Sequence, residues 1–228
     1  MSSDANNAPG PRAFVYDPPP AGPLPVIHAD DHLLVLDKPS GLLSVPGKPA
    51  EHADCLEARV QAVYPDARIV HRLDMDTSGI IIMARTAHAQ RHLGLQFEKR
   101  QTAKTYQALV FGEMAEDEGQ VEAPLITDWP NRPKQMIDPE RGKPALTRWR
   151  VLERAEGRSR VELKPMTGRS HQLRVHMLSL GHPILGDNLY AHEDALAASQ
   201  RLCLHACKLG LRHPEGGEAM LFESPVPF

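Results

Sequence analysis

The sequence predicts an α+β fold with a mixed, mainly antiparallel central sheet. Short apolar segments outnumber helical ones, and most of them are joined by turns rather than by helices. The chain has 228 residues, 41% of them hydrophobic, which suits one domain with a sizeable core. We expect residues 25–228 to form that domain. Residues 1–24 contain a run of three prolines and few large apolar side chains, so we expect a disordered or extended lead-in.

The first half of the domain is predicted to alternate strands and helices. Its expected elements are strands at 26–28 and 33–36, a helix at 56–63, a strand at 80–84 and a helix at 86–99. The strand at 80–84 is the clearest, because its apolar run is short, β-branched at its start and preceded by Gly79. Pro65 ends the first helix, and Thr86 can cap the second through its hydroxyl group.

The second half is predicted to be richer in strands. They are expected at 105–111, 146–152, 161–163, 202–211 and 220–222, with short strands and long loops between 113 and 143. One helix is expected after Ser170, which can cap it. Its apolar face would be formed by Leu173, Met177 and Leu180, and Gly181 would end it.

Composition favours a cytoplasmic protein without a metal site. No apolar stretch is long enough to cross a bilayer, and the N-terminus lacks the pattern of a signal peptide. The three cysteines, Cys55, Cys203 and Cys207, form no even disulfide framework, which fits a reducing compartment. Cys203 and Cys207 are expected to be small core residues. The twelve histidines show no zinc-type spacing.

The charge is unevenly distributed along the chain. The net charge is −3, yet residues 132–176 hold twelve Lys or Arg against five Asp or Glu. A locally basic segment can attract phosphate groups even in an acidic protein, because salt screens exposed charges beyond about 8–10 Å. This segment predicts contact with RNA, and the alternative is an exposed face on which the charges form ion pairs.

The nine residues just before the predicted strand at 80–84 contain two acidic residues, an arginine and a histidine. They read His71-Arg72-Leu73-Asp74-Met75-Asp76-Thr77-Ser78-Gly79. A rigid strand that presents a charged loop is a common place for reactive side chains, and the alternative is a solvated acidic turn. Asp74 and Asp76 lie two residues apart, so an extended backbone would turn both carboxylates to one face.

This stretch resembles H-R-L-D-x-x-T-S-G, the catalytic signature of the RluA family of RNA pseudouridine synthases. Further blocks resemble the same family in the same order, at residues 36–42, 104–108, 168–176 and 181–187. Ordered blocks spread over roughly residues 25–225 are much harder to reach by chance than one motif. The resemblance implies a mixed sheet packed about a catalytic cleft. Many family members carry an RNA-binding module before this domain, and residues 1–24 leave no room for one.

The family's reaction constrains the chemistry. Making pseudouridine cleaves the bond between uracil N1 and ribose C1′ and rejoins the base through C5, so neither a redox cofactor nor a metal is demanded. A carboxylate can attack C1′, add to C6 or remove a proton from C2′, and the sequence leaves these three roles open. By resemblance the carboxylate is Asp74. The family motif leaves the position of Asp76 variable, so Asp76 is expected to be a bystander.

The resemblance assigns roles to further residues. Arg174 is expected to grip Asp74 with two parallel hydrogen bonds and keep it ionised, because burial alone would favour a protonated carboxyl. Tyr106 would stack on the extruded uracil, and Arg72 would fill the space that the base leaves. Arg169 is expected to bind phosphate at a helix start, helped by free amides. Further candidate phosphate contacts are Lys38, Arg132, Lys134 and Lys143.

Residues 128–135 resemble the short, single-domain member that modifies both 23S ribosomal RNA and tRNA. We therefore expect ribosomal RNA and tRNA stem-loops as substrates, and a monomer with no obligate protein partner. One alternative is a synthase of this family specific for ribosomal RNA, and another is an RNA-binding protein without catalysis. The stretch Asp74–Thr77 also resembles the start of a metal-dependent phosphatase motif, but here the acids precede the apolar strand instead of following it.

Overall fold

The computed structural model describes residues 16–228. The first fifteen residues of the expected lead-in lie outside the described residues. Residues 16–24 carry no helix or strand and lie against helix α1 (Leu56–Gln61). There the Arg59 guanidinium donates to the carbonyl oxygen of Pro19 at 2.7 Å.

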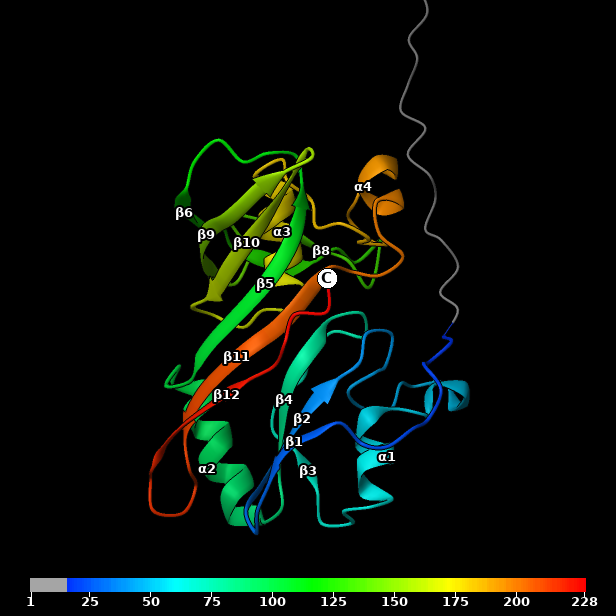
Figure 1. Ribbon diagram of the computed structural model, residues 1–228, viewed down its shortest axis with the longest axis vertical. Helices are drawn as coiled ribbons and strands as arrows, with labels where there is room; N and C mark the ends of the chain where they lie inside the picture. Colours follow the sequence, from blue (N-terminus) through cyan, green and yellow to red (C-terminus); the bar gives the residue numbers. More distant parts are fainter. Residues whose placement is uncertain (1–15) are drawn as a thin grey trace, which may run out of the picture.

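Within residues 16–228, ten strands form one sheet that runs the length of the molecule (Figure 1). They are β1 (Val26–Ala29), β2 (Leu33–Lys38), β3 (Arg68–Ile69), β4 (Ser78–Ala84), β5 (Ala103–Phe111), β6 (Glu118–Glu122), β9 (Leu146–Ala155), β10 (Arg158–Pro165), β11 (Leu204–Arg212) and β12 (Ala219–Glu223). The order is β1-β2-β4-β11-β5-β10-β9-β6, with β3 beside β4 and β12 beside β11. In this part of the chain only β4 and β11 pair in parallel. The predicted mixed, mainly antiparallel α+β fold is confirmed.

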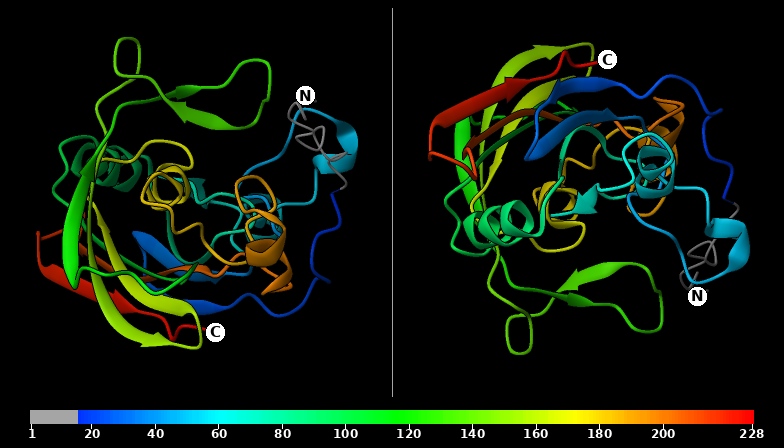
Figure 2. Two further views of the ribbon diagram at one scale, coloured as in Figure 1. Left: turned by 90° about the horizontal axis from the view of Figure 1, so that it is seen from above. Right: turned by 90° about the horizontal axis from the view of Figure 1, so that it is seen from below.

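Helices and one small hairpin complete the fold. The remaining helices are α2 (Ala87–Glu98), α3 (Gln172–Ser179), α4 (Glu193–Ala197) and a 3-10 turn η1 (Ala50–His52). Strands β7 (Leu125–Thr127) and β8 (Gln135–Ile137) pair as a separate two-stranded sheet. Both views of Figure 2 show this hairpin standing out from the body of the molecule, on the side away from β12.

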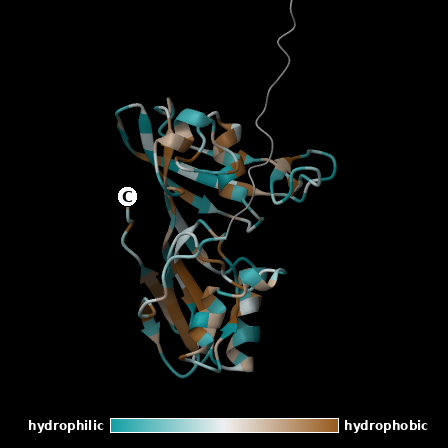
Figure 3. Cartoon of the chain, turned by 90° about the vertical axis from the view of Figure 1, so that its right-hand side faces the viewer, coloured by the Kyte–Doolittle hydropathy of each residue, from teal (hydrophilic) through white to brown (hydrophobic). Residues whose placement is uncertain are grey.

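Strand β4 is buried along its whole length because a helix packs on each of its faces. Side chains alternate along a strand, so neighbours point to opposite faces. Ile80 and Ile82 pack in the cluster that includes α2, while Ile81 and Met83 pack in the cluster that includes α1. The apolar run is therefore continuous instead of alternating, as the brown strands of Figure 3 show. The predicted buried strand is confirmed.

Gly79 allows the parallel contact that fixes the start of β4. It pairs with Ala206 of β11 and has a φ of +112°, a value that side chains rarely tolerate. A Cβ atom at this position would lie 2.4 Å from the carbonyl oxygen of Ala206. The glycine therefore brings the residues just before β4 close to the centre of the sheet.

Helix α3 differs from its prediction at its start. Ser170 does not cap it: the N-cap is His171, which has a left-handed backbone with φ of 53° and makes no side-chain cap. The predicted apolar face is confirmed, since Leu173 and Met177 are buried in the largest core cluster and Leu180 packs against it. The opposite side of residues 172–177 is buried as well, and only Leu178 and Ser179 at the end of α3 are exposed.

The other local predictions have mixed outcomes. The Thr86 cap of α2 is confirmed by a 3.0 Å hydrogen bond from the amide of Ala89. Neither α4 nor the two-residue strand β3 was predicted. Cys203 and Cys207 are buried thiols, as expected. No helix in residues 16–228 has the length and apolar character to cross a membrane.

Candidate active site

A cleft of about 1800 Å³ opens between the two halves of the sheet. One wall is the signature loop, defined here as His71–Thr77, and another is the loop between β7 and β8. The start of α3 and the segment after Asp187 close the remaining side. Three of the resembled blocks, at residues 71–79, 104–108 and 168–176, therefore contribute to one space, as predicted for a catalytic cleft.

The signature loop is held by the last residue of β2 and by the segment that follows this strand. The Lys38 ammonium group donates to three carbonyl oxygens at 2.7–2.9 Å, one of which belongs to Met75. Ser40 Oγ donates to the carbonyl oxygen of Asp76 at 2.6 Å. These bonds fix the backbone at Met75 and Asp76, which helps to set the directions of the neighbouring carboxylates.

Lys38 is therefore not placed to bind phosphate, and that prediction is wrong. Its side chain is fully buried. Burial lowers the pKa of this ammonium group to about 7, although the nearby carboxylates of Asp76 and Asp74 favour the charged form. The sequence could not distinguish a surface lysine from one whose three donors serve the protein backbone.

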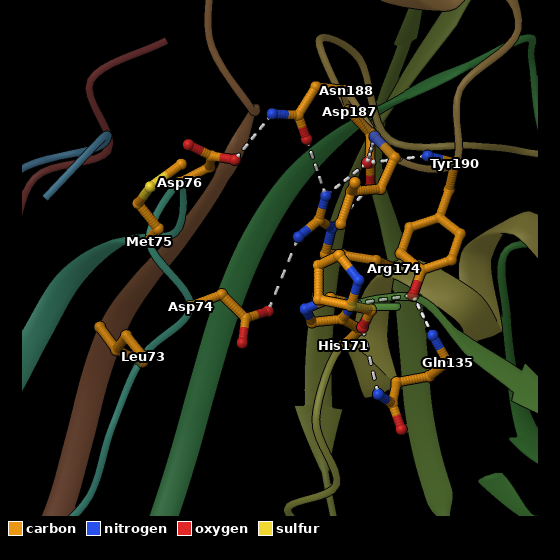
Figure 4. Close-up of polar contacts among 12 residues, drawn as sticks. Leu73, Asp74, Met75, Asp76, Gln135, His171, Arg174, Asp187, Asn188 and Tyr190 are labelled. Atoms are coloured by element: carbon orange, nitrogen blue, oxygen red, sulfur yellow. Dashed lines mark hydrogen bonds and ion pairs between the residues drawn. The ribbon is translucent and has the colours of Figure 1, made fainter. Parts of the chain in front are cut away.

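Arg174 makes its two-bond contact with a different carboxylate from the one predicted. Its Nε and Nη2 atoms donate to Asp187 at 2.8 and 2.6 Å, and both side chains are buried. Its Nη1 atom lies 3.9 Å from Asp74 Oδ2 (Figure 4). Burial acts to lower the pKa of Arg174, but Asp187 outweighs it and the pKa is raised. Arg174 is thus a fixed cation beside Asp74, positioned by Asp187.

The second carboxylate of the signature loop also reaches the cleft. Figure 4 shows Asp76 beside Asp74, with Asn188 donating to Asp76 Oδ2 at 3.1 Å. Burial raises the pKa of Asp76, and the charge of Arg174 opposes that rise. The two aspartates share one face, as expected from their spacing, but they have different partners.

Tyr106 and Lys104 line the cleft from β5. Burial raises the pKa of the Tyr106 phenol, and the negative charge of Asp74 adds to this effect. Burial lowers the pKa of Lys104, and Arg100 lowers it further. Tyr106 was a candidate from the sequence. Lys104 was not, although it stands two residues away in the same resembled block.

The remaining predicted RNA contacts divide into two groups. Arg72, Arg132, Lys134 and Arg169 line the cleft. Lys143 is exposed, but it is not among the cleft-lining residues. The amide of Arg169 itself is not free, because it donates to Gln172 Oε1 at 3.0 Å.

The basic side chains in excess within residues 132–176 lie in two different environments. Within this segment, charges on the β9–β10 arm form ion pairs, such as Arg150 with Glu162 and Arg160 with Glu153. Other basic side chains of the segment face the cleft, including Arg132 and Lys134. Both readings of the charge pattern therefore apply, each to a different part of the segment.

Asp187 and Tyr190 are site residues that the sequence did not reveal. Asp187 lay in a resembled block, but its partner Arg174 is thirteen residues earlier and the spacing gives no sign of the pair. Tyr190 follows that block, and its ring lies 5.2 Å from the Arg174 guanidinium. Local patterns could not have identified either contact.

Residues 32–179 match the model of the RNA pseudouridylate synthase family. The chain belongs to this family. This synthase is 53% identical over 214 residues to the dual-specificity RNA pseudouridine synthase RluA of Escherichia coli K12, covering 93% of this chain and 98% of that protein. The RluA of Pasteurella multocida is likewise 53% identical, with the same coverage. The predicted family is confirmed.

Solved structures lead to the same family. The synthase resembles human RNA pseudouridylate synthase domain containing 1 with a TM-score of 0.77 and 30% identity, over 93% of this chain and 87% of that one. It resembles human RNA pseudouridylate synthase domain containing 4 with a TM-score of 0.72 and 26% identity, over 89% and 88%. The phosphatase alternative is not supported, because the acidic residues precede β4 in a mainly antiparallel sheet.

Proposed function

We propose that this synthase isomerises uridine to pseudouridine in both ribosomal RNA and tRNA stem-loops, with Asp74 as the essential carboxylate. The observation that carries the assignment of Asp74 is its place in a cleft of about 1800 Å³, with Arg174 Nη1 3.9 Å away. The dual substrate choice is supported by the relatives named dual-specificity synthases, which are 53% identical over nearly their whole length.

The reaction requires an anionic group beside a uridine that has been flipped out of the base stack. In the reaction the bond from N1 to C1′ breaks, the bond from C5 to C1′ forms, and the proton lost from C5 is balanced by one gained at N1. Flipping the uridine out costs a few kcal/mol of stacking. The Tyr106 ring can return about 1–3 kcal/mol by stacking on the base, and the exposed Arg72 can occupy the vacated space.

The charges around the cleft suit an RNA backbone. Arg132 and Lys134 on the β7–β8 loop line the same cleft as Arg72 and Lys104. Phosphate contacts of this kind position RNA without reading its sequence. We assign the choice of site to the shape of the RNA loop held between these walls. The same proposal includes a cytoplasmic monomer, the state in which one chain supplies the whole cleft.

Asp74→Asn tests the proposal, with Asp76→Asn as its matched comparison. Both changes remove one negative charge at nearly constant shape from the same loop. We expect Asp74→Asn to abolish tritium release from RNA labelled at uracil C5 while RNA binding persists, and Asp76→Asn to retain most of the turnover. Substantial turnover by the Asp74 variant, or loss confined to the Asp76 variant, would reverse the assignment.

A further inference from the structure

The Tyr190 hydroxyl group joins the RNA-facing hairpin to the start of α3. Its oxygen lies 2.7 Å from the backbone nitrogen of Gln135 in β8 and 2.7 Å from Nδ1 of His171 (Figure 4). A backbone amide can only donate, so it takes a lone pair of the phenol oxygen. Among residues 16–228, Nδ1 of His171 is the only other hydrogen-bond partner of this oxygen, so the phenol proton has an acceptor when Nδ1 is unprotonated.

This geometry determines which nitrogen of His171 carries a proton. A neutral imidazole has one donor and one acceptor nitrogen. Because Nδ1 accepts from Tyr190, the ring proton is on Nε2. Among residues 16–228, Nε2 has no hydrogen-bond partner of its own. The ring thus keeps one donor that the protein does not use.

His171 is held where that donor can meet a substrate. It lines the cleft, and Figure 4 shows it between Asp74 and Tyr190. Burial lowers the pKa of the imidazole, and Arg174 acts in the same direction, against the carboxylates of Asp74, Asp187 and Asp76. The ring is therefore neutral at pH 7 and offers an N–H group without a full positive charge. Its left-handed backbone, with φ of 53°, turns the side chain at the N-cap of α3.

We infer that His171 Nε2–H donates a hydrogen bond to an acceptor oxygen of the target uridine, with Tyr190 as the positioning residue that fixes the tautomer. This inference rests on the proposed function. It also links the hairpin to the reacting nucleotide through hydrogen bonds. The amide of Gln135 in β8 sets the direction of the Tyr190 proton, and that proton sets the tautomer of His171. An RNA loop that moves the hairpin would disturb this donor.

Two substitutions at His171 separate the donor from the shape. His171→Gln carries an amide N–H near the position of Nε2, whereas His171→Leu carries none. Both face the same left-handed backbone, so the strain is matched. In single-turnover reactions on one RNA hairpin, we expect His171→Leu to be slower by about tenfold to a hundredfold, the effect of losing one hydrogen bond, and His171→Gln to recover most of the rate. RNA affinity measured beside the rates separates chemistry from binding.

Tyr190→Phe tests the positioning step, since it keeps the ring beside Arg174 and removes only the hydroxyl group. We expect nitrogen NMR of the wild-type enzyme to show the Nε2–H tautomer at His171 and the variant to show a mixture, with a lower single-turnover rate. A purely structural tyrosine would leave the tautomer unchanged. An Nδ1–H tautomer in the wild type, or a His171→Leu variant as fast as the wild type, would overturn the inference. Absence of turnover in the wild type would instead overturn the proposed function.

Discussion

Arg174 serves two carboxylates with different geometries. Its two parallel bonds, at 2.8 and 2.6 Å, go to Asp187, which is buried as deeply as the arginine itself. The attraction between the two charges offsets the free-energy cost of burying them. Asp187 also accepts hydrogen bonds from the amides of Leu189 and Tyr190. Only Nη1 faces Asp74. The arginine is therefore oriented by one acid so that it can act on another.

Substitutions at Arg174 should separate these roles. Arg174→Ala leaves Asp187 buried without its partner and should cost about 3–5 kcal/mol of unfolding free energy. Arg174→Lys keeps a cation but cannot make two parallel bonds, so we expect a smaller loss of about 1–3 kcal/mol. Urea denaturation measures both. Equal losses in the two variants would show that the two-bond geometry contributes nothing.

Lys38 gives a stability change that depends on pH. Its pKa is lowered from 10.5 to about 7 in the folded protein. Between these values the unfolded chain holds a proton that the folded chain has lost, so this residue makes unfolding free energy rise with pH, by at most about 1.4 kcal/mol per pH unit. Lys38→Met removes this contribution. We expect the wild-type-minus-variant difference in unfolding free energy, from urea titrations between pH 7 and 9.5, to increase with pH.

The same variant should also lower kcat without weakening RNA binding. The buried ammonium group holds the carbonyl oxygen of Met75 and touches no surface. If the variant instead lost RNA affinity while keeping kcat, the result would support the sequence-based prediction that Lys38 contacts phosphate. The comparison therefore separates a lysine that holds the signature loop from one that binds substrate.

Among the elements, the β7–β8 hairpin is the one that we propose contacts RNA. Its loop is closed by a hydrogen bond from the amide of Asp128 to the carbonyl oxygen of Lys134, and Arg132 lies over the Trp129 ring at 4.6 Å. Trp129 is 64% exposed, a high value for the largest aromatic side chain. The tip thus presents cations and an aromatic face on a defined backbone.

We expect loss of the hairpin cations to weaken binding to both RNA classes together. Arg132→Ala combined with Lys134→Ala should lower the slope of log affinity against log salt by roughly one to two units. Lys143→Ala is the matched control, because Lys143 is exposed in the same region but is not a cleft-lining residue. Filter binding over a salt series gives the slopes. A change confined to one RNA class would mean that these residues read a particular loop.

The elements predicted best from the sequence are those set by local rules. Strand β4 follows from its apolar run, and the start of α2 follows from a threonine three residues before the amide it caps. The start of α3 was missed because His171 takes its left-handed backbone in the context of Tyr190, nineteen residues away. Helix α4 spans five residues, too few for the helical repeat of apolar side chains to be visible in the sequence. In the site, Asp74 followed from a motif, while the pairing of Arg174 depends on the folded chain.

On the scale of the whole molecule, the sheet joins two halves that each supply part of the cleft. The half containing β4 brings the signature loop, and the half containing β9 and β10 brings α3 and the hairpin. The long strands β5 and β11 pair with each other and connect the halves. A single cleft built in this way has a small footprint, which favours compact stem-loops over extended RNA surfaces.

The substrate choice can be decided by mapping pseudouridine in total RNA from a strain that lacks this protein. If the proposed dual specificity holds, at least one site disappears from ribosomal RNA and one from tRNA, because one cleft treats both kinds of stem-loop. Both sites should return when the wild-type chain is supplied and stay absent with the Asp74→Asn variant, which keeps the RNA-binding walls and lacks the carboxylate. Loss confined to ribosomal RNA would end the dual assignment and leave the chemistry at Asp74 intact. Restoration by the Asp74 variant would mean instead that another enzyme makes the modification and that this chain assists it by binding RNA.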